Sequence, residues 1–322
     1  MNALSTRQSW LLHGGLLLVA VVYPLVFRSS FMVNFGVLAL FYALIGQSWN
    51  IAGGFAGQLS FGHVVFFGAG AYASTILQMR FGFNPWWGLP ASALAGAVVG
   101  WVIGFLSFRA GLKGSYFALI TLAFAEVLRI VANSVGITGG GLGMLVPAKP
   151  SAANFQFPER IGFYYLILAL AAASIAIAVW LKHSRFGAQL AAIRENEDAA
   201  RALGINAFRE KIKVLMLSGA IAGVGGCFFA QYFLYIDPTI VFGIDKSIEM
   251  LLVSMIGGAG TVYGPLIGAV LLALVSDATR AMSSVQGLSL LLYGALLIVI
   301  IAFLPNGLAD LFRRVLRRKG GA

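Results

Sequence analysis

Apolar runs of about twenty residues recur along almost the whole chain, and they limit what it can fold into. A helix rises about 1.5 Å per residue and the hydrocarbon core of a bilayer is about 30 Å thick, so about 20 apolar residues form one crossing. The pattern predicts an all-α, polytopic membrane protein. The runs occupy residues 10–27, 31–51, 60–79, 86–108, 115–135, 161–181, 212–235 and 287–304.

The composition argues against a water-soluble globule. Residues of the AVILMFWYC set make up 60% of the chain, whereas a soluble domain reaches about 45–50% with glycine included. Only 10% of the residues are charged, against about 25% in soluble proteins. We therefore expect membrane lipid to cover the apolar excess. The single cysteine, Cys227, excludes a disulfide framework, and we expect no metal site.

A broken apolar stretch near the C-terminus decides the predicted number of crossings. Residues 245–257 and 263–279 are both apolar, but glycines and Pro265 separate them. Counted as two crossings, they bring the total to about ten and put both termini in the cytoplasm. This arrangement leaves 15 of the 22 Lys and Arg residues inside, as the positive-inside rule requires. The alternative, one re-entrant unit, would move the basic tail at 310–322 outside.

The net charge of +11 does not indicate a nucleic-acid partner, because most basic residues lie between apolar runs or after the last one. The N-terminal run, 10–27, is longer than the apolar region of about 7–15 residues in a signal peptide, so we interpret it as a span. We predict that residues 1–322 form the single transmembrane domain of a multi-pass membrane protein.

The loop at 182–213 carries 11 of the 33 charged residues and is the longest predicted cytoplasmic segment. Residues 189–203 are rich in helix formers and contain no proline, which predicts one short amphipathic helix. We expect its apolar stripe to contain Leu190, Ile193, Ala200 and Leu203. Gly204 is expected to end the helix in a left-handed cap. The simplest interpretation is a surface helix that only connects two spans.

The order Asp198, Ala199, Ala200, three residues and then Gly204 resembles the EAA loop of ABC importer permeases, with Asp in place of Glu. Longer stretches resemble the LivM-type permeases of branched-chain amino acid importers, and the resemblance covers about residues 34–308. It is less specific for the substrate, since permeases for urea and short amides share much of it. The stretches are GQLSFGHVVFFGAGAY (57–72), GLKGSYFALITLAFAEVLR (111–129), TGGGLG (138–143), RENEDAARALGI (194–205) and MIGGAGTVYGPLIGA (255–269).

The resemblance implies a permease subunit in the bacterial inner membrane. It would work with a second, homologous permease, two cytoplasmic ATPase subunits and a soluble solute-binding protein. Leucine, isoleucine and valine are the implied substrates. The loop would couple the permease to its ATPase through Arg194, Glu195, Asp198, Ala199, Ala200 and Gly204. The chain has no G-x-x-x-x-G-K-[ST] motif, so we expect no ATPase activity and no cofactor of its own, with ATP bound by the partner subunits.

Two glycine clusters, 53–62 and 257–264, echo each other and suggest an internal repeat. Transporters often place the broken helices of two repeats beside the substrate, which would put these glycines along the translocation path. The alternative is that the glycines mark ordinary turns at the membrane surface. The candidate residues of the translocation path are Gly57, Gln58, Ser60, His63, Glu126, Gly257, Gly258 and Gly260. We expect His63 to be a hydrogen-bonded interfacial residue and Glu126 to pair with Arg129, three positions later on one helix face.

Other glycines predict helix packing without any role in transport. Gly96, Gly100 and Gly104 are spaced by four residues, as are Gly219 and Gly223, and such small residues let helices approach closely. Two rival functions stay open on the sequence alone. An ion-coupled secondary transporter would need buried carboxylates, for which Glu126 is the candidate. The other rival is a membrane-embedded enzyme or scaffold. No catalytic cluster supports an enzyme, and a scaffold would not need spans that are broken by glycines.

Overall fold

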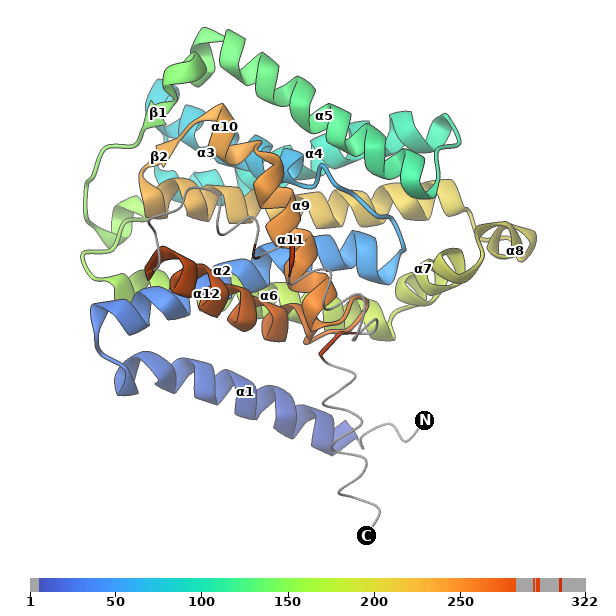
Figure 1. The fold of residues 1–322 in the computed structure, drawn as a ribbon, viewed down its shortest axis with the longest axis horizontal. Coiled ribbons are helices and arrows are strands. Elements are labelled where there is room, and N and C mark those ends of the chain that lie inside the picture. Colours follow the sequence, from blue (N-terminus) through green and yellow to red (C-terminus); the bar gives the residue numbers. More distant parts are fainter. Residues whose placement is uncertain (1–5, 282–291, 293, 296–306, 309–322) are drawn as a thin grey trace.

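The computed structural model describes residues 6–281, 292, 294–295 and 307–308, and within them the chain is a bundle of helices (Figure 1). The strands in this part of the chain are two residues long, β1 (Met144–Leu145) and β2 (Tyr235–Ile236), so the all-α prediction holds. The predicted span at 287–304 falls almost wholly outside the described residues, and the tail at 310–322 lies entirely outside them.

The long helices follow the predicted apolar runs closely. Five helical stretches of the described residues are long and apolar enough to cross a membrane, which supports a multi-pass protein and leaves the count of ten crossings a prediction. The long helices are α1 (Thr6–Val26), α2 (Ser30–Trp49), α3 (Val64–Phe81), α4 (Gly88–Arg109), α5 (Gly114–Ser134), α6 (Arg160–His183), α9 (Ala207–Phe233) and α12 (Gly264–Ala281). A π-helix, η1 (Asn50–Phe55), extends α2, and a short turn, η2 (Pro85–Trp87), precedes α4.

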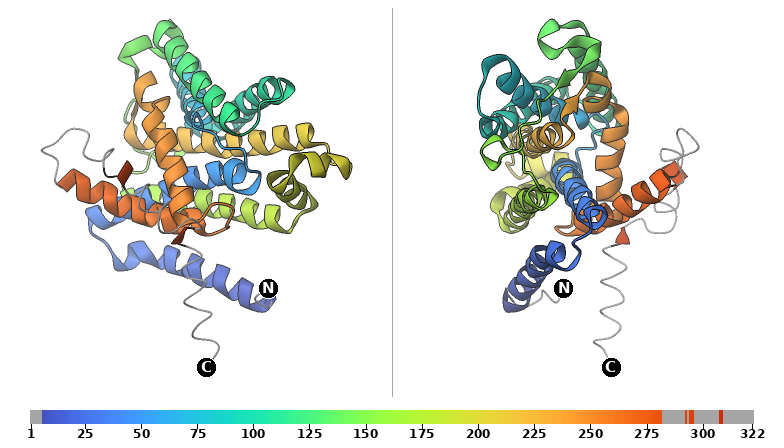
Figure 2. Two further views of the ribbon diagram at one scale, coloured as in Figure 1. Left: turned by 45° about the vertical axis from the view of Figure 1, so that its right-hand side comes forward. Right: turned by 90° about the vertical axis from the view of Figure 1, so that its left-hand side faces the viewer.

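The core of the bundle lies around α2 and α9. From Gly36 to Trp49 every residue of α2 is buried, and α9 is buried along most of its length. By contrast, α1 lies at the edge of the bundle (Figures 1 and 2), where the Tyr164 hydroxyl of α6 donates to the carbonyl of Ala20 at 2.7 Å. Helices that are apolar all round but only partly buried are those expected to face lipid.

The glycine stripes pack α4 against α9, as predicted. A Cβ atom built on Gly96 would lie 2.0 Å from the Gly219 carbonyl oxygen, and one on Gly219 would lie 2.3 Å from the Gly96 carbonyl oxygen. Gly223 approaches Ser92 of α4 in the same way, at 2.2 Å. The two backbones therefore touch along a seam where no larger side chain fits. We call this contact the α4–α9 seam.

The first half of the broken stretch does not run alongside the other helices. α11 (Ile244–Gly257) follows a single turn, α10 (Pro238–Val241), and crosses the bundle at a steep angle to the long helices in every view (Figures 1 and 2). Its 14 residues give about 21 Å of helix, which is too short to cross the bilayer core alone. The chain then turns at 258–263 and returns as α12.

The predicted span at 60–79 is wrong in its first part, because residues 56–63 are not helical and α3 begins only at Val64. Neighbouring helices bind the freed backbone of this segment. The Thr121 hydroxyl of α5 accepts from the Gly62 amide at 3.3 Å, and the Ser247 hydroxyl of α11 accepts from the Val64 amide at 2.9 Å. Irregular backbone inside a membrane protein is stable only when protein or water satisfies it in this way.

The loop between α5 and α6 is ordered by contacts with the end of α9. It contains three short turns, η3 (Gly136–Thr138), η4 (Gly140–Leu142) and η5 (Ala152–Asn154), and β1 pairs with β2 in antiparallel register, Met144 with Ile236. Further along the loop, the Gln156 amide donates to Gln231 of α9 at 3.4 Å. This loop lies at one end of the bundle.

Candidate functional site

The loop at 182–213 forms two helices at the opposite end of the bundle. They are α7 (Arg185–Glu195) and α8 (Glu197–Ala202), and α8 projects from the bundle (Figure 1). The prediction of one continuous helix over 189–203 is wrong. Asn196 is extended (φ −157°, ψ 106°), and its side-chain oxygen accepts from the amides of Asp198 and Ala199 at 3.0 Å each. This N-cap starts a new helix, which acidic residues in its first turn stabilise.

The apolar stripe predicted for this loop is only partly correct. Leu190, Ile193 and Ala200 are buried, and Ala200 packs against Ile193 and Ala207 at the elbow between the two helices. Leu203 is 81% exposed, because α8 has turned away from the axis of α7. Gly204 takes the predicted left-handed conformation (φ +84°) and ends α8.

Ion pairs fix α8 to the bundle, and Glu197 is at their centre. Its carboxylate accepts from Lys211 of α9 at 3.1 Å and from Arg201 at 2.6 Å. The Lys211 ammonium also lies 4.3 Å from the centre of the Phe108 ring. Asp198 forms an ion pair at 3.1 Å with Lys113, which lies between α4 and α5. The Asp198 side chain is nevertheless 81% exposed. Glu197, Lys211 and Lys113 were not singled out from the sequence, because their pairing depends on how three helices meet.

The two glycine clusters are in contact, although about 200 residues separate them. Asn50, at the start of η1, bridges them with its buried side chain. Its oxygen accepts from the Gly260 amide at 2.7 Å, and its NH₂ group donates to the Thr261 carbonyl at 2.9 Å. A Cβ on Gly54 would lie 2.3 Å from the Gly260 nitrogen, so glycine is required for this approach. Sequence reasoning missed Asn50, for which a polar residue inside an apolar run was the available signal.

Arg194 joins α7 to this contact. Its Nη1 donates to the Gly54 carbonyl at 2.9 Å, while its Nη2 donates to Glu195 at 2.9 Å. Gly57 and Gly260 flank the side chain, and Cβ atoms at these glycines would lie 2.8 Å and 2.9 Å from Arg194 atoms. We call the place where η1, the turn at 258–263 and Arg194 meet the inner junction. The sequence associated Arg194 with coupling but gave no sign of its contact with Gly54.

The other predicted path residues of the first cluster line the non-helical segment that leads to α3. Gln58 is 8% exposed and donates to the carbonyl of Ala56, and Ser60 is fully buried. His63 is also fully buried, and its Nε2 lies 2.9 Å from the Ser218 hydroxyl of α9. It is hydrogen-bonded as expected, but it lies inside the protein and not at an interface with water.

Glu126 and Gly257 lie outside the inner junction. The Glu126 carboxylate accepts two hydrogen bonds from Arg129, as the spacing predicted, and its side chain is 45% exposed. Gly257 and Gly258 end α11, where a Cβ on Gly257 would lie 1.7 Å from the Gly264 carbonyl oxygen. Gly257 therefore allows the tight return from α11 to α12.

Among the described residues, no group of three His, Cys, Asp or Glu side chains could hold a metal ion.

A continuous chain of contacts leads from the exposed helix α8 to the interior of the bundle. α8 is exposed, α7 connects it to Arg194, and Arg194 holds the carbonyl of Gly54 in η1. The non-helical segment at 56–63 follows η1 in the chain, and the turn between α11 and α12 contacts η1 across the inner junction. α8 is therefore linked to the two broken stretches of the bundle through one side chain and one short helix.

Comparison with known proteins places the chain among membrane transport proteins. The family described as "Branched-chain amino acid transport system / permease component" matches residues 31–301. The chain is 30% identical to the high-affinity branched-chain amino acid transport system permease protein LivM of Salmonella typhimurium, over 98% of this chain and 79% of the relative.

More distant relatives include a second type of branched-chain amino acid permease and a sugar permease. The chain is 24% identical to LivH of Salmonella typhimurium, over 86% of this chain and 94% of the relative. It is 27% identical to the L-arabinose ABC transporter permease protein AraH of Azospirillum brasilense, over 81% and 74%. No solved structure matches the chain.

Proposed function

Because this chain belongs to the family of branched-chain amino acid permease components, we propose that it is the permease subunit of an ATP-driven importer for these amino acids. A second, homologous permease completes the translocation path, two cytoplasmic ATPase subunits supply the work, and a soluble binding protein delivers the solute. The similarity of this one chain to both LivM and LivH supports a pair of related permeases.

One observation carries the proposal: an exposed helix is connected through Arg194 to the place where two broken membrane segments meet. In the proposal, α8 is the docking surface for the ATPase. Asp198, Ala199 and Leu203 are exposed on it and are therefore accessible to a partner. The loop contributes seven Lys and Arg residues at this end, and Arg109 and Lys113 lie there too, which supports a cytoplasmic orientation.

In the proposed mechanism, closure of the ATPase subunits displaces α8 and α7. Arg194 then either pulls η1 through the Gly54 carbonyl or releases it, because a hydrogen bond weakens steeply when its angle changes. The segments at 56–63 and 258–263 follow, and the path opens toward the cytoplasm. Ten crossings with both termini in the cytoplasm complete the proposed topology in the bacterial inner membrane.

The test is uptake of labelled L-leucine by the complete importer in proteoliposomes. We expect uptake to require ATP and the binding protein, and to persist when an ionophore collapses the ion gradients. The variants Asp198→Arg and Leu203→Asp change exposed side chains and should abolish uptake while the chain remains folded in the membrane. A larger residue at position 200 would be a poor test, because Ala200 is buried at the elbow and the change would disturb the packing of the two helices. Full uptake by both variants would contradict docking through α8.

The substrate and the energy source each have a rival that the same assay separates. Competition by urea, acetamide or L-arabinose would point to another solute, and AraH makes the sugar worth including. Uptake without ATP but with an ion gradient would indicate a secondary transporter. Such a transporter needs a free buried carboxylate. Buried Glu210 and Glu249 pair with Lys213 and Lys246, so a candidate for that role is Asp277 of α12, which has a buried carboxylate oxygen without a hydrogen-bond partner among the described residues.

A further inference from the structure

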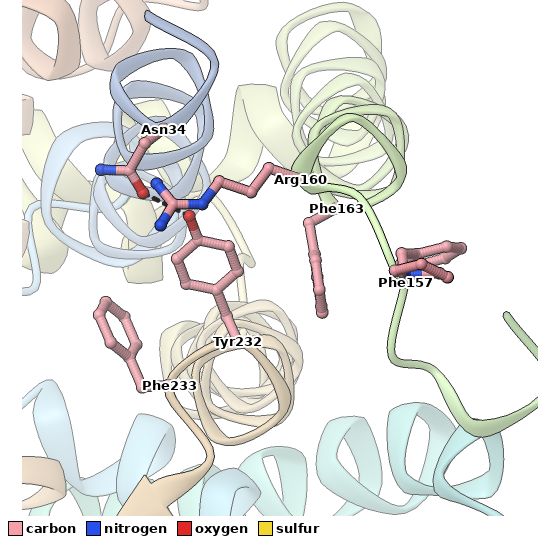
Figure 3. Close-up of a pocket in the computed structure, with 7 residues that line it drawn as sticks. Asn34, Phe157, Arg160, Phe163, Tyr232 and Phe233 are labelled. Atoms are coloured by element: carbon pink, nitrogen blue, oxygen red, sulfur yellow. Dashed lines mark hydrogen bonds between the residues drawn. The ribbon is translucent and has the colours of Figure 1, made fainter. Parts of the chain in front are cut away.

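A cavity of about 340 Å³ opens at the end of the bundle opposite α8. It lies where α2 and α6 begin and α9 ends, so three helices contribute to its wall. Figure 3 labels six of the lining residues and places polar groups on one side and aromatic rings on the other. They are Asn34, Phe157, Arg160, Phe163, Tyr232 and Phe233. The volume lies within the range of about 300–1,000 Å³ that is usual for small-molecule sites.

The aromatic wall is built around Phe163. Its ring packs edge-to-face against Phe157, with 5.3 Å between ring centres, and against Tyr232, at 5.2 Å. Gly162 makes room for this arrangement, because a Cβ at that position would lie 2.4 Å from the Phe157 ring. The wall is therefore a fixed apolar surface, suited to a small aliphatic group.

The polar side of the cavity contains a cation without a carboxylate partner. Arg160 donates one long hydrogen bond, 3.5 Å, to the Ser30 carbonyl, and no carboxylate among the described residues lies within 4 Å of it. Its side chain points toward Asn34 and Tyr232, whose hydroxyl donates to the Asn34 side-chain oxygen (Figure 3). A guanidinium carries five N–H donors in a planar fork that matches a carboxylate, so most of its binding capacity is free.

We propose that this cavity binds an amino acid with an aliphatic side chain. Arg160 holds the α-carboxylate in a bidentate pair, and the aromatic wall takes the side chain. The ammonium group faces the Asn34 oxygen, which has a second lone pair, and the neighbouring ring faces. The choice of L-leucine as the ligand rests on the proposed function, whereas the zwitterion-binding geometry does not.

The main competing occupant is a lipid phosphate, since Arg and aromatic residues often anchor helices at the membrane surface. An anchoring arginine extends away from its own protein toward the headgroups. Arg160 is exposed to solvent, but its side chain lies over the open cavity between Asn34 of α2 and Tyr232 of α9. The position of the cavity also suits a solute that arrives from outside, on the side away from the ATPases.

The experiment is equilibrium binding of tritiated L-leucine to the assembled permease complex, isolated through this chain, in phosphatidylcholine nanodiscs without ATP or binding protein. We expect saturable binding that L-leucinol, which lacks the carboxylate, does not displace. Arg160→Met should weaken binding about 10- to 100-fold, as expected for loss of a charged hydrogen-bonded pair. Arg160→Lys should retain part of the affinity, because its charge remains without the fork.

Arg28→Met is the matched control, because Arg28 lies at the same end of the chain's bundle, is exposed and donates only to the Leu25 carbonyl at 3.2 Å. It should bind like the unmodified chain. Absence of binding, or binding that Arg160→Met does not change, would overturn the proposal. Displacement of leucine by phosphatidylglycerol would assign the cavity to lipid and would overturn the proposal too.

The outcomes also separate this site from the proposed function. If the importer fails to transport leucine but Arg160-dependent binding persists, then the function is wrong and the site is correct. If ATP-driven uptake is intact and the nanodisc complex binds no leucine, then only the site is wrong. Unchanged thermal unfolding of Arg160→Met would show that any loss of binding does not come from a folding defect.

Discussion

Glycines bring backbones into contact both along the α4–α9 seam and at the inner junction, but in the described part of these two contacts polar side chains hold irregular backbone only at the inner junction. In the seam, Gly96 and Gly219 face each other's carbonyl oxygens, and helix packing holds the contact. At the inner junction, Asn50 and Arg194 hold together segments that leave the regular helix on either side. A packed seam has one arrangement, whereas hydrogen bonds to loop backbone can break and form again.

The difference suggests a division between a fixed and a movable part of the bundle. Close backbone packing over several glycines holds the α4–α9 seam, so we expect the pair to move as one body. The inner junction connects an exposed helix to two interrupted segments, so we expect relative motion there. Hinges and helix breaks are where large changes in backbone angle are absorbed.

The largest effect should come from Gly219→Leu, which fills the α4–α9 seam. Its side chain would collide with the Gly96 backbone, and overpacking of this kind costs about 3 kcal/mol or more of folding free energy. We expect loss of the monodisperse protein in size-exclusion chromatography of the detergent-solubilised chain. Gly14→Leu is the control, because nothing lies within 4 Å of a Cβ there. A well-folded Gly219→Leu protein would mean that the seam can adapt.

Arg194→Ala should leave the fold intact and separate ATP hydrolysis from transport. Hydrogen bonds to charged groups contribute about 1.5–3 kcal/mol, so we expect leucine uptake to fall about 10- to 100-fold while ATPase activity of the complex continues. Arg209→Ala lies in the same loop and is the matched control, since Arg209 forms no ion pair with the described residues. Equal loss of both activities would indicate a docking role and not transmission.

Asn50→Ala should loosen the inner junction without breaking the link to α7. Two neutral hydrogen bonds contribute about 0.5–1.5 kcal/mol each, so the opened fraction should rise about tenfold. We would measure it as faster labelling of a Thr261→Cys chain by a small thiol reagent, against a low background because the native Cys227 is buried.

The control for Asn50→Ala is Asn154→Ala in the loop between α5 and α6, which should not change labelling at position 261. Equal labelling rates with and without the Asn50 side chain would show that packing alone closes the inner junction. The contrast with the α4–α9 seam would then disappear.

The smallest effect should come from Glu126→Gln. This carboxylate pairs with Arg129 at a partly exposed site and makes no described contact with the inner junction, so uptake should change less than about twofold. Arg129→Gln should behave alike, because it removes the same pair from the other side. A severe loss of uptake in Glu126→Gln alone would indicate that Glu126 lines the translocation path. It would also weaken the assignment of motion to the inner junction.

The parts of the fold that follow from local pattern could be predicted from the sequence. The apolar runs located most of the helices, because hydrophobic length alone decides what can cross a bilayer. The four-residue spacing of Gly96, Gly100, Gly219 and Gly223 likewise predicted close packing, and Gly204 was correctly expected to adopt a positive φ.

The errors arose where chemistry at one residue outweighs the average of its neighbours. The helix formers of 189–203 concealed the N-cap at Asn196, although the following acidic pair was a visible signal. An apolar run also says nothing of whether its backbone is helical, so the non-helical start of 60–79 was missed. Gly62 must pass close to the Thr121 carbonyl there, which only the assembled bundle determines.

The inner junction could not be deduced from the sequence at all. Asn50 and Gly260 are 210 positions apart, and no periodicity relates residues at that distance. The glycine clusters were recognised as similar to each other, but similarity does not imply contact. Arg194 was included among the coupling residues because of its place in the loop, and its bond to Gly54 gives that inclusion a physical reason.

The ordered loop between α5 and α6 has a consequence for the speed of solute delivery. Its pairing with the end of α9, through Met144 and Ile236 and through Gln156 and Gln231, means that the chain presents a preformed surface at that end. A delivery protein that docks there has no flexible segment to immobilise, so little conformational entropy is lost on encounter. In the proposed importer, collision frequency and charge steering, and not loop rearrangement, would then limit how fast the loaded binding protein engages the permease.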